Sequence, residues 1–193
     1  MIRTILLAAV GAAALFAASP ASAYEIDILT GKPLVVSNAD LTQAQVQAIA
    51  REEIAYRGSE APGTIIVNSE ERRLYFVLPG GRAMKYAVGV GRPGFSWAGV
   101  KRVERKAEWP AWTPPAQMLK RRPDLPRHME GGVDNPLGAR AMYLSGSLFR
   151  IHGSNEPETI GQAVSSGCIR MTNEDVIDLY ERVRVGTKVV VLR

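Results

Sequence analysis

Short β-rich runs separated by turn signals fill residues 63–91, GTIIVNSEERRLYFVLPGGRAMKYAVGVG. Branched and aromatic residues in runs of this length are typical of strands, and clusters of glycine, proline and charged residues are typical of turns. Turns are predicted at residues 68–72 and at Pro79-Gly80-Gly81. Three successive strands with such short links must pair with one another or with further strands, so this feature restricts the chain to a β-rich fold.

Further strand signals continue toward the C-terminus. GVKRVERKAEW (99–109) is a strand candidate, RAMYLSGSLFRIHG (140–153) is predicted to form a hairpin turning at Ser145-Gly146-Ser147, and KVVVL (188–192) is predicted to be a closing strand. Residues 109–138 are rich in proline and glycine without sustained periodicity, so a long lid loop is expected there. The sequence therefore predicts a mainly β domain of sandwich or barrel type with one or two helices.

Two segments carry helix signals. Residues 38–58 combine cap candidates, good helix formers and a glycine stop. Near the C-terminus, Thr172 or Asn173 can cap a second helix that stops by Gly186. The spacing i, i+3, i+4, i+7 predicts the buried face of this second helix. Its members are Val176, Leu179, Tyr180 and Val183.

The N-terminus has the composition of a secretory signal peptide. Residues 1–23 contain one positive charge, a short apolar run and the small-residue cleavage pattern Ala21-Ser22-Ala23. The apolar run is too short to cross a bilayer, and an uncleaved anchor helix is the alternative. We expect export to the periplasm or cell envelope, no stable membrane span after cleavage, an N-terminal extension over 24–62 and one domain over 63–193.

The net charge is mildly basic. It is +5 for the whole chain and +4 (+5 − 1) after loss of Arg3, and no basic arm or aromatic-basic repeat is present. Nucleic acid is therefore not expected as a partner. A carboxylate-rich or polyanionic envelope substrate is compatible with this charge.

The chain contains one cysteine, Cys168. Exported proteins that use cysteine for structure carry it in pairs, so an unpaired thiol is buried and inert, intermolecular, or reactive. Cys168 follows the tight turn 165–167 and precedes the predicted C-terminal helix, whose dipole would lower the thiol pKa. His152, at the end of a predicted strand, can act as a base or as the partner of an ion pair.

Neighbouring residues complete a candidate acyl-transfer site. Backbone amides of Gly167 and Cys168 can form an oxyanion hole, and Arg170 can hold a carboxylate through paired hydrogen bonds. Structural roles remain open for two residues: His152 as an ordinary hydrogen-bonded histidine, and Arg170 as part of a salt bridge. No metal site is predicted, because a closed zinc site needs four ligands and His128 has no ligand spacing to the other candidates.

The segment HGSNEPETIGQAVSSGCIRMTNEDVIDLY (152–180) resembles the catalytic signature of the L,D-transpeptidases, the YkuD-like fold. The similarity extends upstream through YAVGVGRPGFSWAG, RKAEWPAWTPP and NPLGARAMYL and covers roughly residues 63–193. The resemblance implies a β-rich, sandwich-like catalytic domain that remodels bacterial peptidoglycan with a cysteine and no cofactor.

The family's functional residues map onto this chain position by position. The resemblance implies that Cys168 is the nucleophile and His152 the general base, with the Gly153 carbonyl orienting the imidazole. Arg170 matches the arginine of the active-site motif. Many members carry histidine where this chain has Ser166, which removes a possible second imidazole from the oxyanion side.

The implied reaction is attack of Cys168 on the L-centre carbonyl of meso-diaminopimelate in a stem tetrapeptide, with release of D-alanine. A second stem peptide's side-chain amine then takes the acyl group, which makes a 3→3 cross-link. With water as acceptor the protein would be an L,D-carboxypeptidase, and with a lysine of an envelope protein it would anchor that protein. A non-catalytic wall-binding module is the alternative of another class, and Arg170 either holds a stem-peptide carboxylate or braces the turn.

Overall fold

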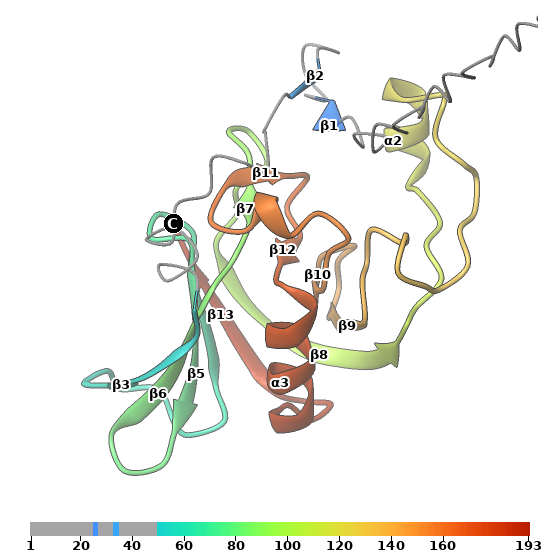
Figure 1. Ribbon diagram of the computed structural model, residues 1–193. Helices are drawn as coiled ribbons and strands as arrows, with labels where there is room; N and C mark the ends of the chain where they lie inside the picture. The colour runs from blue at the N-terminus through green and yellow to red at the C-terminus, as the bar shows by residue number, and fades with distance from the viewer. Residues whose placement is uncertain (1–24, 27–32, 35–49) are drawn as a thin grey trace, which may run out of the picture. The chain divides into compact units, whose positions relative to one another are not determined.

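The computed structural model describes residues 25–26, 33–34 and 50–193 (Figure 1). The chain divides into two compact units, Met1–Val35 and Val36–Arg193. In the first unit, β1 (Glu25–Ile26) and β2 (Pro33–Leu34) form an antiparallel pair. The predicted signal peptide lies outside the described residues. Within the described part of the chain, no helix is both long and apolar enough to cross a membrane.

A nine-stranded mixed sheet forms most of the second unit. Its spatial order is β12-β10-β9-β8-β13-β4-β5-β6-β3. The strands are β3 (Glu52–Ala55), β4 (Ile65–Asn68), β5 (Arg73–Leu78), β6 (Arg82–Ala87), β8 (Gly99–Glu108), β9 (Arg140–Leu144), β10 (Arg150–His152), β12 (Ile169–Arg170) and β13 (Lys188–Leu192). β13 pairs with β4, and β10 with β12, in parallel, whereas the other neighbours are antiparallel. A separate parallel pair joins β7 (Val90–Gly91) to β11 (Ala163–Ser165).

The strand predictions from residue 63 onward are confirmed. The three opening runs are β4, β5 and β6, joined as antiparallel neighbours. The candidate strand at 99–109 is β8, and the predicted hairpin is β9 with β10, turning through residues 145–149. The closing strand is β13, which fits between β4 and β8 in the middle of the sheet.

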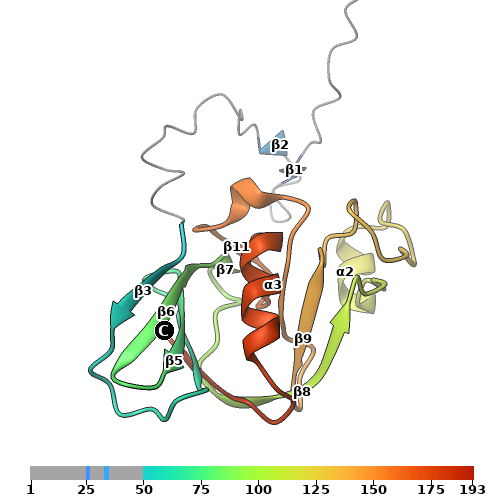
Figure 2. The same ribbon diagram turned by 60° about the horizontal axis from the view of Figure 1, so that its bottom comes forward.

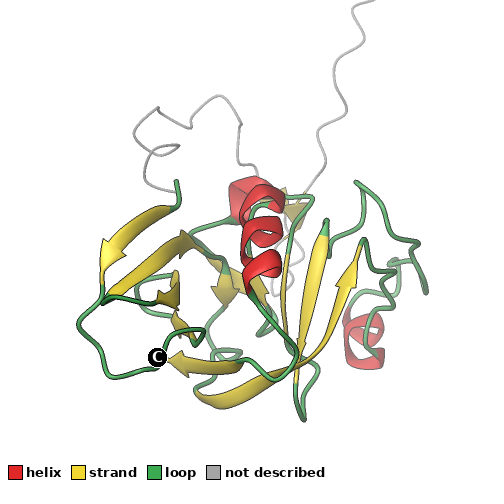
Figure 3. Cartoon of the chain, turned by 90° about the horizontal axis from the view of Figure 1, so that it is seen from below, coloured by secondary structure: helices red, strands yellow, loops and turns green. Residues whose placement is uncertain are grey.

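The sheet curls around one helix. β8 is ten residues long, and its register against β9 shifts between Val103 and Arg105. An irregularity of this kind bends a strand and increases its twist. The two halves of the sheet turn toward each other with α3 (Asn173–Arg182) between them (Figures 2 and 3). The mainly β, curled architecture agrees with the predicted fold class.

Helix α3 carries the apolar face that the spacing predicts. Val176 and Leu179 are fully buried and Val183 nearly so, while Tyr180 packs against the cluster from its edge. They meet strand residues from both halves of the sheet, including Ile65, Leu74, Tyr86, Met142 and Leu144. Each such buried side chain contributes roughly 1.5–3 kcal/mol relative to an exposed one. The core therefore fixes α3, and with it the loop that leads into α3 from the site.

The helix expected over residues 38–58 is wrong where the structure describes it. Residues 38–49 lie outside the described residues, and β3 occupies 52–55, with Ile54 opposite Ala83 of β6. Glutamate and alanine are good helix formers, but helix propensity is a weak preference that tertiary contacts override, and pairing with the edge of β6 decides the local structure instead. β3 is therefore an edge strand of the same sheet as the elements that follow residue 63.

The expected lid loop at residues 109–138 contains a short helix that the sequence does not indicate. α2 (Ala116–Arg121) has six residues, too few to show an apolar period. Trp112 and Met129 exchange both backbone hydrogen bonds at 2.8 Å, which closes the loop below α2. The loop therefore has a defined backbone structure.

Candidate active site

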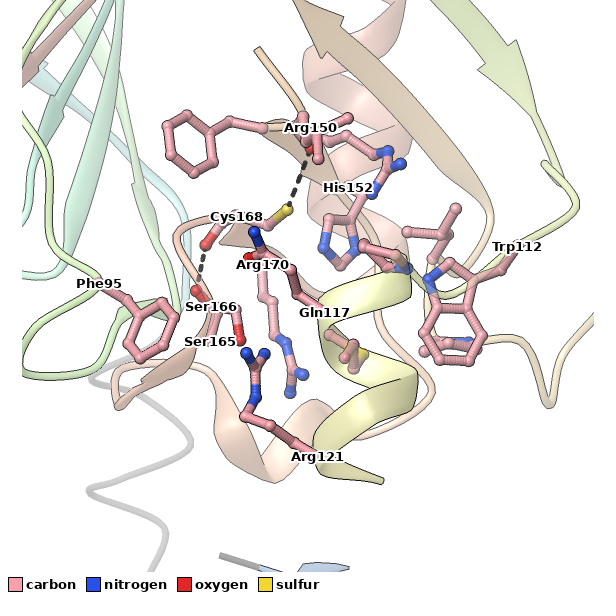
Figure 4. Close-up of a pocket in the computed structure, with 16 residues that line it drawn as sticks. Phe95, Trp112, Gln117, Arg121, Arg150, His152, Ser165, Ser166, Cys168 and Arg170 are labelled. Atoms are coloured by element: carbon pink, nitrogen blue, oxygen red, sulfur yellow. Dashed lines mark hydrogen bonds between the residues drawn. The ribbon is translucent and has the colours of Figure 1, made fainter. Parts of the chain in front are cut away.

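Two neighbouring strands bring the candidate residues to one face. β10 and β12 run parallel with Ile151 opposite Ile169 and His152 opposite Arg170. Ile151 and Ile169 are buried in the core, so alternation turns the residues before and after them toward the other face. That face lines a cavity of ≈ 440 Å³, and the Cys168 sulfur points toward the His152 imidazole (Figure 4).

The imidazole of His152 is held in one tautomer. Its side chain is buried, with 4% of the residue exposed, and Nδ1 lies 2.6 Å from the Gly153 carbonyl oxygen. A carbonyl only accepts, so Nδ1 carries the proton and Nε2 is left as an acceptor. Burial, reinforced by the charge of Arg170, lowers the pKa of His152 to about 3, although the Gly153 carbonyl opposes this shift. The ring is therefore neutral at pH 7 and able to take a proton at Nε2.

Gly153 is glycine because the chain passes too close for a side chain. A Cβ there would overlap Asn173 Oδ1 and would lie 3.0 Å from the Ala139 nitrogen. Asn173 Oδ1 already accepts from the Ala139 amide at 2.8 Å, so it is not free to move aside. This packing holds the Gly153 carbonyl where His152 needs it.

Cys168 is partly exposed and its thiol is protonated at rest. Burial of the sulfur raises the pKa of Cys168, against the lowering influence of Arg150 and Arg170. The predicted lowering of this pKa is wrong, because burial of the sulfur outweighs the influences that lower it. The resting pair is thus a neutral thiol beside a neutral imidazole, not a thiolate–imidazolium pair.

The turn before Cys168 is braced by Ser165, which the sequence did not single out. Its Oγ donates to the Cys168 carbonyl at 2.6 Å and accepts from the Gly167 amide at 3.1 Å. The Gly167 amide is therefore engaged inside the turn. Of the two amides predicted as oxyanion donors, the Cys168 amide is the one that makes no hydrogen bond within this turn.

Two aromatic residues hold the same turn from outside, and neither was predicted. Trp97 Nε1 donates to the Gly167 carbonyl at 2.8 Å, and the Trp97 and Phe149 rings stack with centroids 4.7 Å apart. Gly167 has φ +106°, and a Cβ there would meet the Phe149 ring at 2.5 Å. Because Trp97 is 70 residues from Gly167, only the folded chain reveals this support.

Ser166 lies beside a cation. Arg92 NH1 donates to Ser166 Oγ at 3.2 Å, and the Arg92 guanidinium lies 4.1 Å from the centre of the Phe95 ring. Ser166 and Phe95 both line the cavity. The structure thus places a buried arginine next to Ser166.

Arg170 lines the cavity but is already paired. Its NH1 lies 2.9 Å from Glu156 Oε2 and 3.4 Å from Thr159 Oγ1. This ion pair ties β12 to the short 3-10 helix η1 (Pro157–Thr159). Of the two roles left open by the sequence, the observed contacts are those of a brace.

The opposite wall comes from the loop around α2. Gln117, Met118 and Arg121 of α2 line the cavity together with Trp112 (Figure 4). None of the described residues that line it is an aspartate or a glutamate. Trp109 and His128 of the same loop do not line the cavity: Trp109 is 42% exposed, and His128 lies within hydrogen-bond distance of Thr113 and Glu130.

The sequence of the described sheet and site matches a known family. Residues 62–191 match the model of the YkuD family, the L,D-transpeptidase catalytic domain. The chain belongs to this family. The L,D-transpeptidase domain thus spans the sheet from β4 to β13, both walls of the cavity and Cys168 with His152.

Curated relatives share the domain rather than their full length. This L,D-transpeptidase domain is 40% identical over 137 residues to the "Probable L,D-transpeptidase ErfK/SrfK" of Escherichia coli strain K12, covering 66% of this chain and 43% of that protein. It is 34% identical over 134 residues to the "Putative L,D-transpeptidase YqjB" of Bacillus subtilis, covering 66% and 69%. The chain therefore spans less than half the length of the ErfK/SrfK relative.

Solved structures share the fold. An L,D-transpeptidase from Mycobacterium smegmatis superposes with a TM-score of 0.55 at 16% identity, covering 67% of this chain and 58% of that one. A mutant Enterococcus faecium L,D-transpeptidase gives 0.53 at 22% identity, covering 67% and 49%. At these identities the likeness establishes the L,D-transpeptidase fold.

Proposed function

We propose that the protein is a periplasmic peptidoglycan L,D-transpeptidase in which Cys168 is the nucleophile and His152 the general base. One observation carries the proposal: the only thiol of the chain faces a neutral imidazole whose Nε2 is an acceptor, in one cavity. A nucleophile beside a base that a third group orients is the general arrangement for covalent catalysis. Membership of the family supplies the reaction class.

The first half-reaction forms a thioester. The Cys168 Sγ–H proton passes to His152 Nε2 as sulfur attacks the L-centre carbonyl of diaminopimelate in a stem tetrapeptide. The Gly153 carbonyl, 2.6 Å from Nδ1, stabilises the imidazolium that results. The amide of Cys168 is the proposed donor to the oxyanion. Collapse breaks the peptide bond, and the imidazolium returns the proton to the amine of the departing D-alanine.

The second half-reaction transfers the acyl group. An acceptor amine, the side-chain amine of a second diaminopimelate, attacks the thioester while His152 Nε2 takes its proton. The tetrahedral intermediate then collapses, Cys168 is released as the thiol, and a 3→3 cross-link remains. One histidine thus serves as base and acid in both halves.

The cavity suits a peptide that carries carboxylates. Arg121, Arg150 and Arg170 line it and no acidic residue does so among those described. Stem peptides bear several carboxylates, so the positive field attracts the donor. We assign Ser166 and Gly167 to the turn that presents Cys168, and Arg170 to a brace that ties β12 to η1 through Glu156.

Product analysis tests the proposal and separates the acceptors. The protein from Tyr24 onward is incubated with a diaminopimelate tetrapeptide, and the products are separated by liquid chromatography. Cross-linked dimers support the transpeptidase, free tripeptide alone supports an L,D-carboxypeptidase, and linkage to a supplied envelope protein supports anchoring. Turnover should be lost in His152→Ala and kept in His128→Ala, the matched change at the other histidine. Equal turnover in the two variants would contradict the role of His152.

A further inference from the structure

Strand register places Arg150 next to the nucleophile. The parallel pairing of Ile151 with Ile169 and of His152 with Arg170, continued by one residue, sets Arg150 opposite Cys168. Alternation then turns Arg150 and His152 to the same face, and both line the cavity with Cys168. Figure 4 shows Arg150, His152 and Cys168 around the same cavity.

The charge of Arg150 is not balanced by an acid. Among the described residues, no carboxylate forms an ion pair with it, and its Nε is buried without a hydrogen-bond partner. The guanidinium instead lies 5.3 Å from the centre of the Tyr143 ring. Arg170, the other arginine beside Cys168, differs in that Glu156 neutralises it at 2.9 Å.

Arg150 is only partly exposed, and a cation that is partly withdrawn from water without a balancing acid is stabilised when an anion forms beside it. The charged and titratable side chains around the thiol are Arg150 and His152 of β10, Arg170 of β12 and Arg121 of α2. Since His152 is neutral at rest, it supplies no positive charge before proton transfer. The guanidinium is charged at every working pH.

We propose that Arg150 is the electrostatic partner of Cys168 and stabilises the thiolate that forms when the thiol gives its proton to His152. The charge of Arg150 favours the ionised sulfur and so lowers the pKa of Cys168, in opposition to burial. The inference rests on the proposed function for the use of that thiolate in acyl transfer. The thiolate itself is measurable without substrate.

The test is the pH dependence of Cys168 alkylation by iodoacetamide in the protein from Tyr24 onward. Arg150→Gln should move the midpoint of the profile up by about one pH unit, which is about tenfold slower alkylation at pH 7. Arg150→Lys keeps a cation and should restore most of the shift. The matched control is Arg105→Gln, because Arg105 stacks on the same Tyr143 ring at 3.5 Å but is exposed and outside the cavity.

The control profile should superpose on that of the wild type. A profile of Arg150→Gln that superposes on the wild type, or an equal shift in Arg105→Gln, would overturn the proposal. Far-ultraviolet circular dichroism confirms that each variant is folded. If Arg150→Gln does not fold, Arg150→Met, which keeps the stem against Tyr143, carries the same expectation. Absence of transpeptidation in the wild type would refute the proposed function and leave this test intact.

Discussion

At the scale of single residues, the burial of His152 makes the stability of the protein depend on pH. The unfolded imidazole has its ordinary pKa of 6.5, and burial lowers the pKa of His152 to about 3 in the folded state. Between these values the unfolded chain binds a proton that the folded protein does not. The free energy of unfolding therefore falls as the pH drops through this window.

The expected loss is about 1.4 kcal/mol per pH unit within the window. Replacing His152 by Asn removes this titrating group and its pH dependence. The free energy of unfolding of the wild type, relative to that of His152→Asn, should therefore fall by about 2–3 kcal/mol from pH 7 to pH 4.5. Urea unfolding at the two pH values measures this difference. His128→Asn, at an exposed histidine, should show no such change; a constant advantage for the wild type would refute the buried neutral imidazole.

Gly167 provides a second prediction at this scale. Alanine there must adopt φ +106° and overlap the Phe149 ring, so the turn that presents Cys168 must shift. We expect Gly167→Ala to lower the rate of Cys168 acylation by a tetrapeptide at least about tenfold, since a displacement near 1 Å is enough to cost more. Gly146→Ala is the control, because Gly146 also has positive φ, at +61°, but open space around it. Equal rates in the two variants would exclude a special role for the turn.

The site residues that belong to the sequence motif were predictable. Cys168, His152 and the Gly153 carbonyl lie together as the motif implies, and their catalytic roles remain proposals. Ser165 and Trp97 were missed because each acts through a hydrogen bond to backbone atoms of a turn. No pattern of residue types in the sequence predicts such a bond. The thiol pKa was mispredicted because the burial that raises it depends on the folded chain and not on the residues next to Cys168 in the sequence.

At the scale of elements, the cap of α3 links stability to the site. Thr172 Oγ1 accepts from the Asp175 amide at 3.1 Å, as the sequence predicts. Thr172→Ala should lower the free energy of unfolding by about 1 kcal/mol, whereas Thr172→Ser, which keeps the hydroxyl, should cost only a few tenths. Urea denaturation at pH 7 distinguishes them. An equal loss in both variants would mean that the methyl group, not the cap, is what stabilises α3.

Elements with strong periodicity or turns were predictable, and elements decided by neighbours were not. β4, β5, β6 and α3 carry their own signals. β3 was misread as helix because its pairing with β6 outweighs a weak local propensity. α2 is a six-residue helix inside a loop that is closed by the pairing of Trp112 with Met129.

At the scale of the whole molecule, β3 makes residues before 63 part of the folded unit. β3 covers the edge of β6, and Arg51 pairs with Asp175 of α3 at 2.9 Å. A chain that begins at Gly63 loses both contacts, whereas a chain that begins at Ala50 keeps them. The shorter chain should melt roughly 4 °C or more below the longer one, because each kcal/mol lost shifts Tm by about 2–4 °C at this size. Equal melting temperatures would show that β3 contributes nothing to the unit.

The curled sheet explains why one strand pair can hold a reactive site. β10 and β12 are the last two strands on one edge, and α3 and the core fix their inner face. Their outer face is left to Arg150, His152, Cys168 and Arg170, with the α2 loop as the opposite wall. The motif could be assigned from sequence, but the arrangement of charges around the sulfur required the register of these strands.

Intact-protein mass spectrometry with a diaminopimelate tetrapeptide tests the central claim most directly. The wild type should gain the mass of a tripeptide acyl group, mapped by digestion to the peptide that contains Cys168, and Cys168→Ala should gain nothing. An unmodified wild-type protein after incubation, or the same mass gain in Cys168→Ala, would contradict Cys168 as the nucleophile of an L,D-transpeptidase.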